Sequence, residues 1–354
     1  MSAPPSTTTT RPEARPAAAP RPGRREAAAG VPLLDIADLK VHIHTQGGER
    51  IVKPIEGVSF TLNRGEVVGI VGESGSGKSM TALAIMRLLP PGARYVSGDI
   101  RLDGDSLLAK SDGEIRAIRG RRISMILQDP MVSLDPLFTV GDQLAEALRI
   151  HGVVRTRAEM RERMVELLRA VGIPSPEERL RQYPHEMSGG MLQRIVGAIA
   201  ISCDPELLIA DEPTTALDMT VQAQFLELLE GLQERQNLAL VIITHDFGVA
   251  ARLADKVLVM YAGRVVERAP VAEIFDNPRH PYTRALLGAR PRAGSTGGKL
   301  QSIEGSPPDA ANLPPGCPFA PRCPAAQARC QAEDPPAVVI NAEHVARCWY
   351  AETL

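Results

Sequence analysis

The chain has 354 residues, a length that predicts about two domains. Its net charge of -2 at pH 7 lacks the basic excess of a protein that binds nucleic acid or a membrane surface, so we expect no nucleic-acid partner. The sequence contains no apolar run of about 18 residues that would cross a bilayer, and no apolar stretch of a secretory signal follows the N-terminal arginines. We therefore expect a chain that works in the reducing cytosol.

Four segments follow one another along the chain. Residues 1–30 consist mainly of Pro, Ala, Thr and Arg and predict a disordered tail. Residues 31–290 alternate between strand and helix patterns and predict the main domain. Residues 291–316 are rich in Gly, Pro and Ser and predict a linker, and residues 317–354 carry four cysteines and predict a small C-terminal extension.

The pattern within the second segment predicts an α/β fold. The apolar runs at 66–71, 207–211 and 238–245 are typical of buried parallel strands. Helical patterns at 78–89 and 220–236 lie between such runs. Strands that alternate with helices predict a parallel sheet covered on both faces.

The flanking parts of this segment add further elements. Residues 33–43 and 57–62 predict two strands separated by the turn "QGGER", and residues 254–269 predict a hairpin. Residues 139–203 are mostly helical in pattern and predict a helical subdomain. Within it Thr156 and Glu159 have the spacing of a capping box, and apolar residues then recur at helical spacing.

The stretch "GESGSGKS" at Gly72–Ser79 fits the P-loop pattern G-x-x-x-x-G-K-[ST] between a buried strand and a helix. Such glycines let consecutive backbone N–H groups surround an anion, and the helix N-terminus adds positive charge. We expect Lys78 to reach the β- and γ-phosphates and Ser79 to bind Mg²⁺. The predicted nucleotide-binding residues of this loop are Gly72, Ser74, Gly75, Ser76, Gly77, Lys78 and Ser79.

Polar residues also follow three other buried strands. Asp211 and Glu212 end "LLIADE", Gln128 ends "ISMILQ", and His245 ends "LVIITH". Ligands of a doubly wound sheet bind at the carboxyl ends of its strands, so these four residues and the P-loop are expected to converge. Hydrolysis of a phosphoanhydride needs a metal-binding acid beside a residue that orients water, roles that we assign to Asp211 and Glu212.

The stretch "YPHEMSGGMLQR" places Ser188, Gly189 and Gly190 immediately before an apolar helix. A serine N-cap followed by a flexible glycine pair explains this pattern structurally. A second anion site at a helix N-terminus explains it functionally. If one nucleotide uses both phosphate sites, then either the fold brings the two sites of one chain together, or the two sites come from two different subunits.

These motifs together resemble the nucleotide-binding subunit of ABC transporters. The Walker A stretch, "QDP", "SGGMLQR", "LLIADEP", "ALD" and "THD" occur in the order of that family, and the resemblance covers residues 31–290. "QDPMVSLDPLFTVGDQL" and "RHPYTRALL" are similar to the D-type ATPase of oligopeptide and dipeptide importers. The resemblance therefore implies an ATP-hydrolysing subunit with a P-loop NTPase fold that powers peptide import.

The resemblance also implies partners and roles. Two ATPase subunits would clamp two ATP molecules head to tail, so that Ser188–Gly190 of one faces the P-loop of the other and Asp218 lies at their interface. Catalysis would use Glu212, His245 and Gln128, and Ser79, Gln128 and Asp211 would hold Mg²⁺. The expected partners are a sister ATPase, two membrane permease subunits and, through them, an extracytoplasmic peptide-binding protein. The chain would then lie at the cytoplasmic face of the membrane as a peripheral subunit.

The C-terminal extension contains Cys317, Cys323, Cys330 and Cys348, with no C-x-x-C pair. In a reducing compartment clustered cysteines favour metal binding over disulfides, and four thiolates suit either zinc or an iron–sulfur cluster. The resemblance favours a [4Fe–4S] cluster with a structural role; zinc is the alternative, and free thiols or disulfides are the remaining one. His344 is a possible substitute ligand, but we interpret it as structural.

Two questions stay open. The family usually places an aromatic residue near the end of the first strand to stack on adenine, whereas Ile43 or His44 stands here. The cargo is a second open question, because a binding protein and a permease choose it; a nickel chelate or glutathione would use the same machine. A non-transport ABC ATPase is the remaining alternative, although such proteins usually carry two fused ATPase domains or a long coiled coil, and this chain has one P-loop.

Overall fold

The computed structural model describes residues 30–45, 50–215, 217–289 and 302–353. The tail predicted for residues 1–30 lies outside the described residues except for Gly30, as does the first part of the predicted linker. Within the described ranges, no helix combines the length and the apolar character that a membrane crossing needs.

An eight-stranded sheet forms the centre of the molecule, in the order β11-β12-β10-β9-β3-β8-β7-β6. The five strands from β9 to β6 are parallel, and β10, β12 and β11 continue the sheet in antiparallel fashion. The bounds are β3 (Val67–Val71), β6 (Ile123–Ile126), β7 (Leu207–Asp211), β8 (Ala239–Thr244), β9 (Lys256–Tyr261), β10 (Arg264–Pro270), β11 (Val338–Val339) and β12 (Val345–Ala346).

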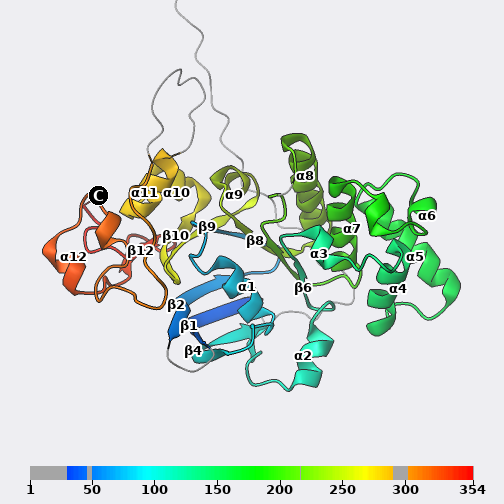
Figure 1. Ribbon diagram of the computed structural model, residues 1–354, viewed down its shortest axis with the longest axis horizontal. Coiled ribbons are helices and arrows are strands. Elements are labelled where there is room, and N and C mark those ends of the chain that lie inside the picture. Colours follow the sequence, from blue (N-terminus) through cyan, green and yellow to red (C-terminus); the bar gives the residue numbers. More distant parts are fainter. Residues whose placement is uncertain (1–29, 46–49, 216, 290–301, 354) are drawn as a thin grey trace, which may run out of the picture.

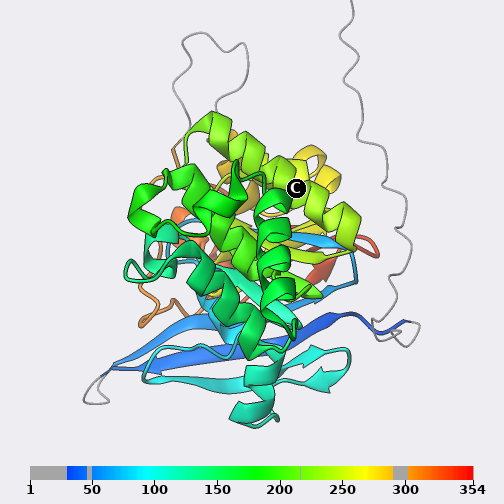
Figure 2. The same cartoon turned by 90° about the vertical axis from the view of Figure 1, so that its right-hand side faces the viewer.

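A second, antiparallel sheet has the order β2-β1-β4-β5 and is drawn in blue and cyan in Figure 2. Its strands are β1 (Leu34–His44), β2 (Ile51–Leu62), β4 (Ala93–Leu102) and β5 (Asp105–Ser106). The two predicted strands are confirmed, and β2 begins earlier than expected. Strand β4 was not predicted, because its sequence "ARYVSGDIRL" is largely polar and exposed and so lacks a clear hydrophobic alternation.

Helices cover the sheets and form one end of the molecule (Figure 1). The predicted helical subdomain contains α4 (Val140–Ile150), α5 (Arg157–Ala170), α6 (Pro176–Arg179), η1 (Pro184–Glu186) and α7 (Gly189–Ile201). The capping box is confirmed, because Thr156 Oγ1 accepts from the Glu159 N–H at 3.2 Å and the Glu159 carboxylate accepts from the Thr156 N–H at 3.0 Å. The other helices are α1 (Lys78–Ile85), α2 (Asp112–Ile118), α3 (Pro130–Ser133), α8 (Met219–Gln236), α9 (Phe247–Leu253), α10 (Val271–Asp276), α11 (Pro281–Gly288), η2 (Ala320–Arg322) and α12 (Ala328–Ala332).

Helix α1 is shorter than the predicted span of 78–89. It ends at Ile85, and Arg87 adopts a left-handed backbone with φ 51°. Pro90 and Pro91 follow Leu89. A residue before proline is disfavoured in the α region, and proline offers no N–H, so the chain leaves the helix before it reaches this pair.

The central strands separate two hydrophobic cores. In β3, Val67 and Val71 belong to the core under the helices, whereas Val68 and Ile70 belong to the core shared with the four-stranded sheet and α1. Successive side chains of a strand point to opposite faces, so one continuously apolar run fills both cores. This confirms the predicted parallel sheet covered on both faces.

The C-terminal extension continues the cassette. Strand β12 pairs with β10, with Glu267 opposite Ala346. The described part of the predicted linker also packs on the main domain, because the Lys53 N–H donates to the Ala310 carbonyl at 2.9 Å and Arg50 pairs with Asp309. Within the described residues the extension and the end of the predicted linker therefore pack on the main domain; strand pairing over long sequence separation leaves no local pattern by which the sequence could have indicated this.

Candidate nucleotide site and four-cysteine pocket

The P-loop connects β3 to α1, as predicted, and two of its glycines are required by geometry. Gly75 has φ +77° and a Cβ there would meet nothing, so it is the backbone conformation that favours glycine. Gly77 has φ +103°, and a Cβ would lie 2.3 Å from the Pro54 carbonyl oxygen, so it also needs the space. Ser74 precedes Gly75, and Ser76 lies between Gly75 and Gly77.

Lys78 folds back over its own loop. Its Nζ donates to the Gly72 carbonyl at 2.8 Å and to the Glu73 carbonyl at 2.9 Å, and the residue is 5% exposed. Burial lowers the pKa of Lys78, and the carboxylates of Glu212 and Asp211 oppose that shift. A lysine held by carbonyls at the mouth of an anion-binding loop is available to exchange those contacts for phosphate oxygens.

Asp211 brings the end of β7 to the P-loop. Ser79 Oγ donates to Asp211 Oδ1 at 3.1 Å across 132 positions of sequence. Burial raises the pKa of Asp211, and the hydrogen bond from Ser79 opposes this shift. A hydroxyl and a carboxylate side by side offer the oxygen ligands that Mg²⁺ prefers, so these two residues fit the ion.

Three side chains meet on one carboxylate oxygen, Glu212 Oε2. Gln128 Nε2 donates to it at 3.3 Å, Thr215 Oγ1 donates to it at 2.9 Å, and His245 Nδ1 lies 3.3 Å from it. The predicted convergence of Gln128, Glu212 and His245 is thus present in the structure. Thr215 was missed; it stands three residues after Glu212 in "ADEPTT", a spacing that places it beside the acid.

Glu212 has an unusual backbone. Its φ of 46° lies in the left-handed region that non-glycine residues rarely adopt, and its N–H donates to the Ile243 carbonyl at 2.9 Å. Backbone strain of this kind concentrates at functional sites, because the surrounding structure holds a side chain where chemistry needs it. Here it directs the carboxylate toward Gln128 and His245.

The predicted second anion site lies elsewhere on the surface. Ser188 is the N-cap of α7 and accepts from the Met191 N–H, and its exposed neighbour Gly189 has open space where a Cβ would be. Gly190 approaches α8 closely, since a Cβ would lie 2.6 Å from Val221 Cγ1. Helix α7 belongs to the helical end of the molecule, opposite the C-terminal extension (Figure 1).

Asp218 lies near this surface at the start of α8. Its carboxylate accepts from the Thr220 and Val221 N–H groups at 3.0 and 2.9 Å, so the acid caps the helix. Met219, the next residue, is 87% exposed.

The region expected to contact adenine is formed by β1 and β2. Ile43 is half-buried and lies opposite Val52, and His44 is exposed. Two residues beyond Val52, the Pro54 carbonyl approaches Gly77 of the P-loop. This edge is therefore close to the phosphate loop and presents an aliphatic and an imidazole group at the predicted positions.

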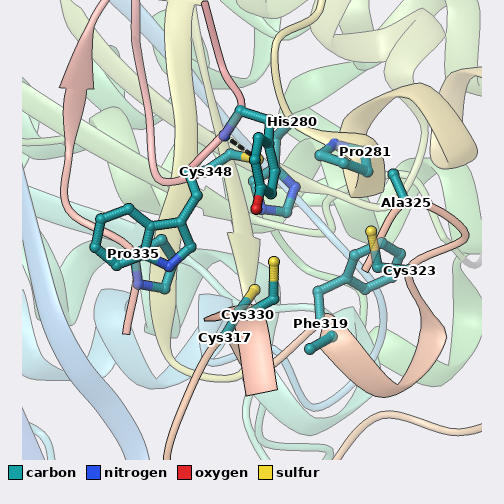
Figure 3. Close-up of a pocket in the computed structure, with 12 residues that line it drawn as sticks. His280, Pro281, Cys317, Phe319, Cys323, Ala325, Cys330, Pro335 and Cys348 are labelled. Atoms are coloured by element: carbon teal, nitrogen blue, oxygen red, sulfur yellow. Dashed lines mark hydrogen bonds between the residues drawn. The ribbon is translucent and has the colours of Figure 1, made fainter. Parts of the chain in front are cut away.

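The four cysteines of the extension line one pocket (Figure 3). The Cys317 N–H donates to the Cys330 carbonyl at 2.8 Å, and all four thiols are free. Burial raises the pKa of Cys317 to about 11 and also raises the pKa values of Cys323 and Cys348. His344 contributes no ligand here, because its Nε2 contacts Glu267 at 2.8 Å instead.

The spacing of these thiols limits what they could hold. Within the part of the chain that the structure describes, no three His, Cys, Asp or Glu side chains are grouped closely enough to bind a single metal ion. Phe319, Ala320 and Pro335 also line the pocket and give it apolar walls. The four cysteines offer only thiol sulfur atoms as donors.

A P-loop joined to the strand ends that carry Asp211 and Glu212 defines a P-loop nucleoside triphosphatase. Similarity to known proteins places the chain in a smaller group within this class. A family model described as "ABC transporter" matches residues 55–215, and one described as "Oligopeptide/dipeptide transporter, C-terminal region" matches residues 266–330. The dipeptide transport ATP-binding protein DppD of Bacillus subtilis is 49% identical over 90% of this chain and 94% of its own length.

Other relatives agree with these matches. A probable peptide ABC transporter ATP-binding protein of Sinorhizobium fredii is 50% identical over 90% of this chain and 94% of its own length. The dimeric post-hydrolysis structure of the ATP-binding cassette MJ0796, bound to ADP and Pi, superimposes with a TM-score of 0.61 at 26% identity, over 67% of this chain and 98% of that one. The chain belongs to the family of ABC ATPases that serve oligopeptide and dipeptide transporters.

Proposed function

We propose that this ATPase powers the import of peptides through a membrane ABC transporter. The observation that carries the catalytic part is the convergence of Gln128, Thr215 and His245 on Glu212 Oε2, beside the Ser79–Asp211 pair. The peptide cargo is supported by the names of the relatives, which are dipeptide and peptide transport ATP-binding proteins. None of the geometry favours a nickel chelate, glutathione or a non-transport role.

The residues divide the chemistry as follows. Lys78 and the backbone N–H groups of the P-loop bind the β- and γ-phosphates of ATP. Ser79, Asp211 and Gln128 hold Mg²⁺, which neutralises phosphate charge when it is bound. Glu212 accepts a proton from the attacking water, and His245 contacts the γ-phosphate. The present contacts of Gln128 and His245 with Glu212 keep all three within reach of that position.

The second half of each ATP site comes from another subunit in this proposal. The exposed Ser188–Gly190 segment offers backbone N–H groups at a helix N-terminus, a favourable place for phosphate. Asp218 and the exposed Met219 lie on the surface that the partner would cover. We take the partner to be a sister ATPase in a heterodimer, and the dimeric structure of the similar cassette MJ0796 supports the pairing of two ATPase subunits.

A second surface fits a membrane subunit. After Gln128 the chain exposes a group of large apolar side chains on and after α3: Met131 at 57%, Val132 at 79%, Leu137 at 80% and Phe138 at 54%. Apolar groups left in solvent together mark protein interfaces. A permease that docks here would hold this chain at the cytoplasmic face of the membrane and connect transport to Gln128. The binding protein would act on the permease from the other side.

The test of this function is ATP-driven uptake. The subunit, co-purified with its permeases and sister ATPase, is reconstituted into liposomes with the peptide-binding protein outside. We expect labelled di- and oligopeptides to accumulate only with ATP inside, and not when Glu212 is replaced by Gln. Accumulation of nickel chelates or glutathione but no peptide would reject the cargo. Full ATPase activity without any co-purifying membrane subunit would reject transport itself.

For the extension, we propose a [4Fe–4S] cluster held by Cys317, Cys323, Cys330 and Cys348, with zinc as the alternative. Four thiols in an apolar pocket are the ligand set of such a cluster. Zinc–sulfur bonds of about 2.3 Å would draw four thiolates within about 4 Å of one another. Among the described residues no three such side chains are grouped to hold a metal ion, so either the zinc ion or the cluster would have to draw the cysteines together. When bound, the cluster would cross-link the extension.

Metal content decides between these alternatives. The protein is purified without oxygen and analysed for iron, acid-labile sulfide and zinc, with absorbance and electron paramagnetic resonance after reduction. We expect iron and sulfide, and their loss in Cys330→Ser. Cys203→Ser is the matched control, because Cys203 lies after α7, far along the chain from the pocket, and contacts the Ala147 carbonyl. A colourless protein with stoichiometric zinc and no sulfide would reject the cluster.

A further inference from the structure

The side chain of Arg322, in the four-cysteine extension, contacts the P-loop. Its Nη1 donates to Glu73 Oε2 at 2.7 Å and its Nη2 donates to Glu73 Oε1 at 3.0 Å, across 249 positions of sequence. Glu73 is the second residue of the P-loop motif, directly after Gly72. A guanidinium that grips both oxygens of a carboxylate fixes the direction as well as the distance of the pair.

Arg322 is itself held in one place. Its side chain is 4% exposed, and its Nε donates to the Glu304 carbonyl at 3.1 Å. The guanidinium carbon lies 5.8 Å from the ring centre of Tyr261 and 6.0 Å from that of Phe319, and Nη1 also donates to Tyr261 Oη at 3.2 Å. Burial and three kinds of partner leave the arginine little freedom, so it provides a fixed point for Glu73.

The main chain of Glu73 is held from the same side. Its N–H donates to Tyr282 Oη at 2.9 Å, and Tyr282 packs on Phe319 of the extension with ring centres 5.2 Å apart. The Glu73 carbonyl accepts from Lys78 Nζ at 2.9 Å. The position of Glu73 therefore influences where the phosphate-binding lysine lies. The extension contacts the Glu73 side chain directly through Arg322 and its backbone indirectly, through the packing of Phe319 on Tyr282.

We propose that Arg322 is a positioning residue for ATP binding, which holds the P-loop in its phosphate-binding shape by gripping Glu73. The four-cysteine extension is then a part of the nucleotide site. Arg322 ends the short helix η2 (Ala320–Arg322), which lies between Cys317 and Cys323. Any change in the cysteine pocket that moves this segment would reach the P-loop through the Arg322–Glu73 pair.

The first experiment measures nucleotide affinity and turnover for Arg322→Ala in the full chain. ATP affinity is followed by equilibrium binding to the chain, and KM and kcat are measured on the complex with its partner subunits. We expect Kd and KM for ATP to rise about tenfold and kcat to change less than about twofold. The reason is that a correctly shaped P-loop stabilises bound ATP and the transition state of hydrolysis equally, so its loss weakens binding without slowing the chemical step. Cargo identity does not enter these readouts.

Arg329→Ala is the matched control within the same extension. Arg329 lies over the Trp349 ring, 3.4 Å from its centre, and pairs with Glu333 at 3.0 Å. It makes no contact with Glu73 that the structure records. We expect its Kd and KM for ATP to match those of the unmodified chain. An equal rise in this variant would mean that any loss from the extension weakens ATP binding, and would overturn the specific role of Arg322.

A double-mutant cycle separates positioning from general loss of folding. Glu73→Gln leaves the extension unchanged but removes the charge that Arg322 grips, so it should raise Kd in the same direction. In a double variant that already carries Arg322→Ala, the Glu73→Gln change should raise Kd for ATP by less than about a further twofold, because the contact is already lost. Arg322→Lys, which keeps the charge without the fork, should restore part of the affinity. The proposal would be overturned if the two changes in Kd for ATP were additive. It would also be overturned if Kd rose by less than about threefold in a folded Arg322→Ala variant.

Discussion

Glu267 and His344 form a fully buried contact between the cassette and its C-terminal extension. Their side-chain atoms Oε1 and Nε2 lie 2.8 Å apart, and both side chains are 0% exposed. Glu267 also accepts from the Arg279 N–H at 2.5 Å and from the His280 N–H at 3.0 Å. One carboxylate on β10 thus connects three parts of the chain, at the point where β12 joins the sheet.

We predict that His344→Ala destabilises the protein by about 3 kcal/mol, because it leaves a buried carboxylate short of one partner. Denaturant unfolding followed by the fluorescence of Trp349, which lies in the same extension and is the only tryptophan of the chain, measures this. Glu333→Ala is the control, since its pair with Arg329 is exposed and should cost less than about 0.5 kcal/mol. If both variants lost the same free energy of unfolding, the buried Glu267–His344 pair would contribute no more to stability than the exposed pair.

Replacement of Glu212 by Gln should separate ATP binding from turnover. The amide keeps the size of the side chain but cannot accept the proton of water, so we expect kcat to fall roughly 10²–10⁴-fold with ATP binding retained and a closed, ATP-bound complex accumulating. Lys78→Ala should instead lose binding or hydrolysis altogether. Both are measured by nucleotide binding and phosphate release, and robust hydrolysis by Glu212→Gln would remove the assignment of the base.

Ser188→Arg should damage the ATP site built on the partner's P-loop. We expect ATPase activity of the assembled complex to fall roughly 10²-fold, as expected when donors to the reacting phosphate are blocked, while ATP binding to this chain's own P-loop is nearly unchanged. Thr156→Arg is the matched control, because it makes the same change at the N-cap of α5. Full activity of an isolated monomer, independent of concentration, would contradict a shared site.

Asp211→Asn should stabilise the nucleotide-free protein while it abolishes activity. Burial raises the pKa of Asp211 above its ordinary value of 3.8, so the folded state binds a proton more readily than the unfolded chain. The free energy of unfolding therefore falls as the pH rises from the ordinary pKa of the unfolded chain through the raised pKa of the folded state. At pH 7.5 the full penalty is present, and its removal should add about 1 kcal/mol.

This gain should shrink as the pH falls toward the ordinary pKa of an aspartate. Urea unfolding without nucleotide or Mg²⁺, at pH 7.5 and at pH 5, measures the difference. Asp218→Asn serves as the control, since Asp218 is an exposed N-cap and asparagine caps a helix equally well. A gain that is the same size at both pH values would mean that burial of the Asp211 charge is not its source.

Some features followed from the sequence because they depend on local spacing. The P-loop turn needs glycines at fixed offsets, and the buried strands read as continuous apolar runs, so Gly72–Ser79 and the strand ends at Asp211, Gln128 and His245 could be assigned. Parallel strands place their carboxyl ends at one edge of a sheet. That rule alone was enough to predict that Glu212 would have Gln128 and His245 beside it.

Other features were decided only by the tertiary structure, because they pair residues that share no local pattern. Nothing in "CPFAPRC" indicates that Arg322 reaches Glu73, 249 positions earlier, and the two-residue strands β11 and β12 are too short to give a periodic signal. The sequence pointed to an extension behind a linker. Packing of Phe319 into the main core and pairing of β12 with β10 instead made it part of the cassette, since buried aromatic area and strand hydrogen bonds outweigh the freedom of a Gly- and Pro-rich connection.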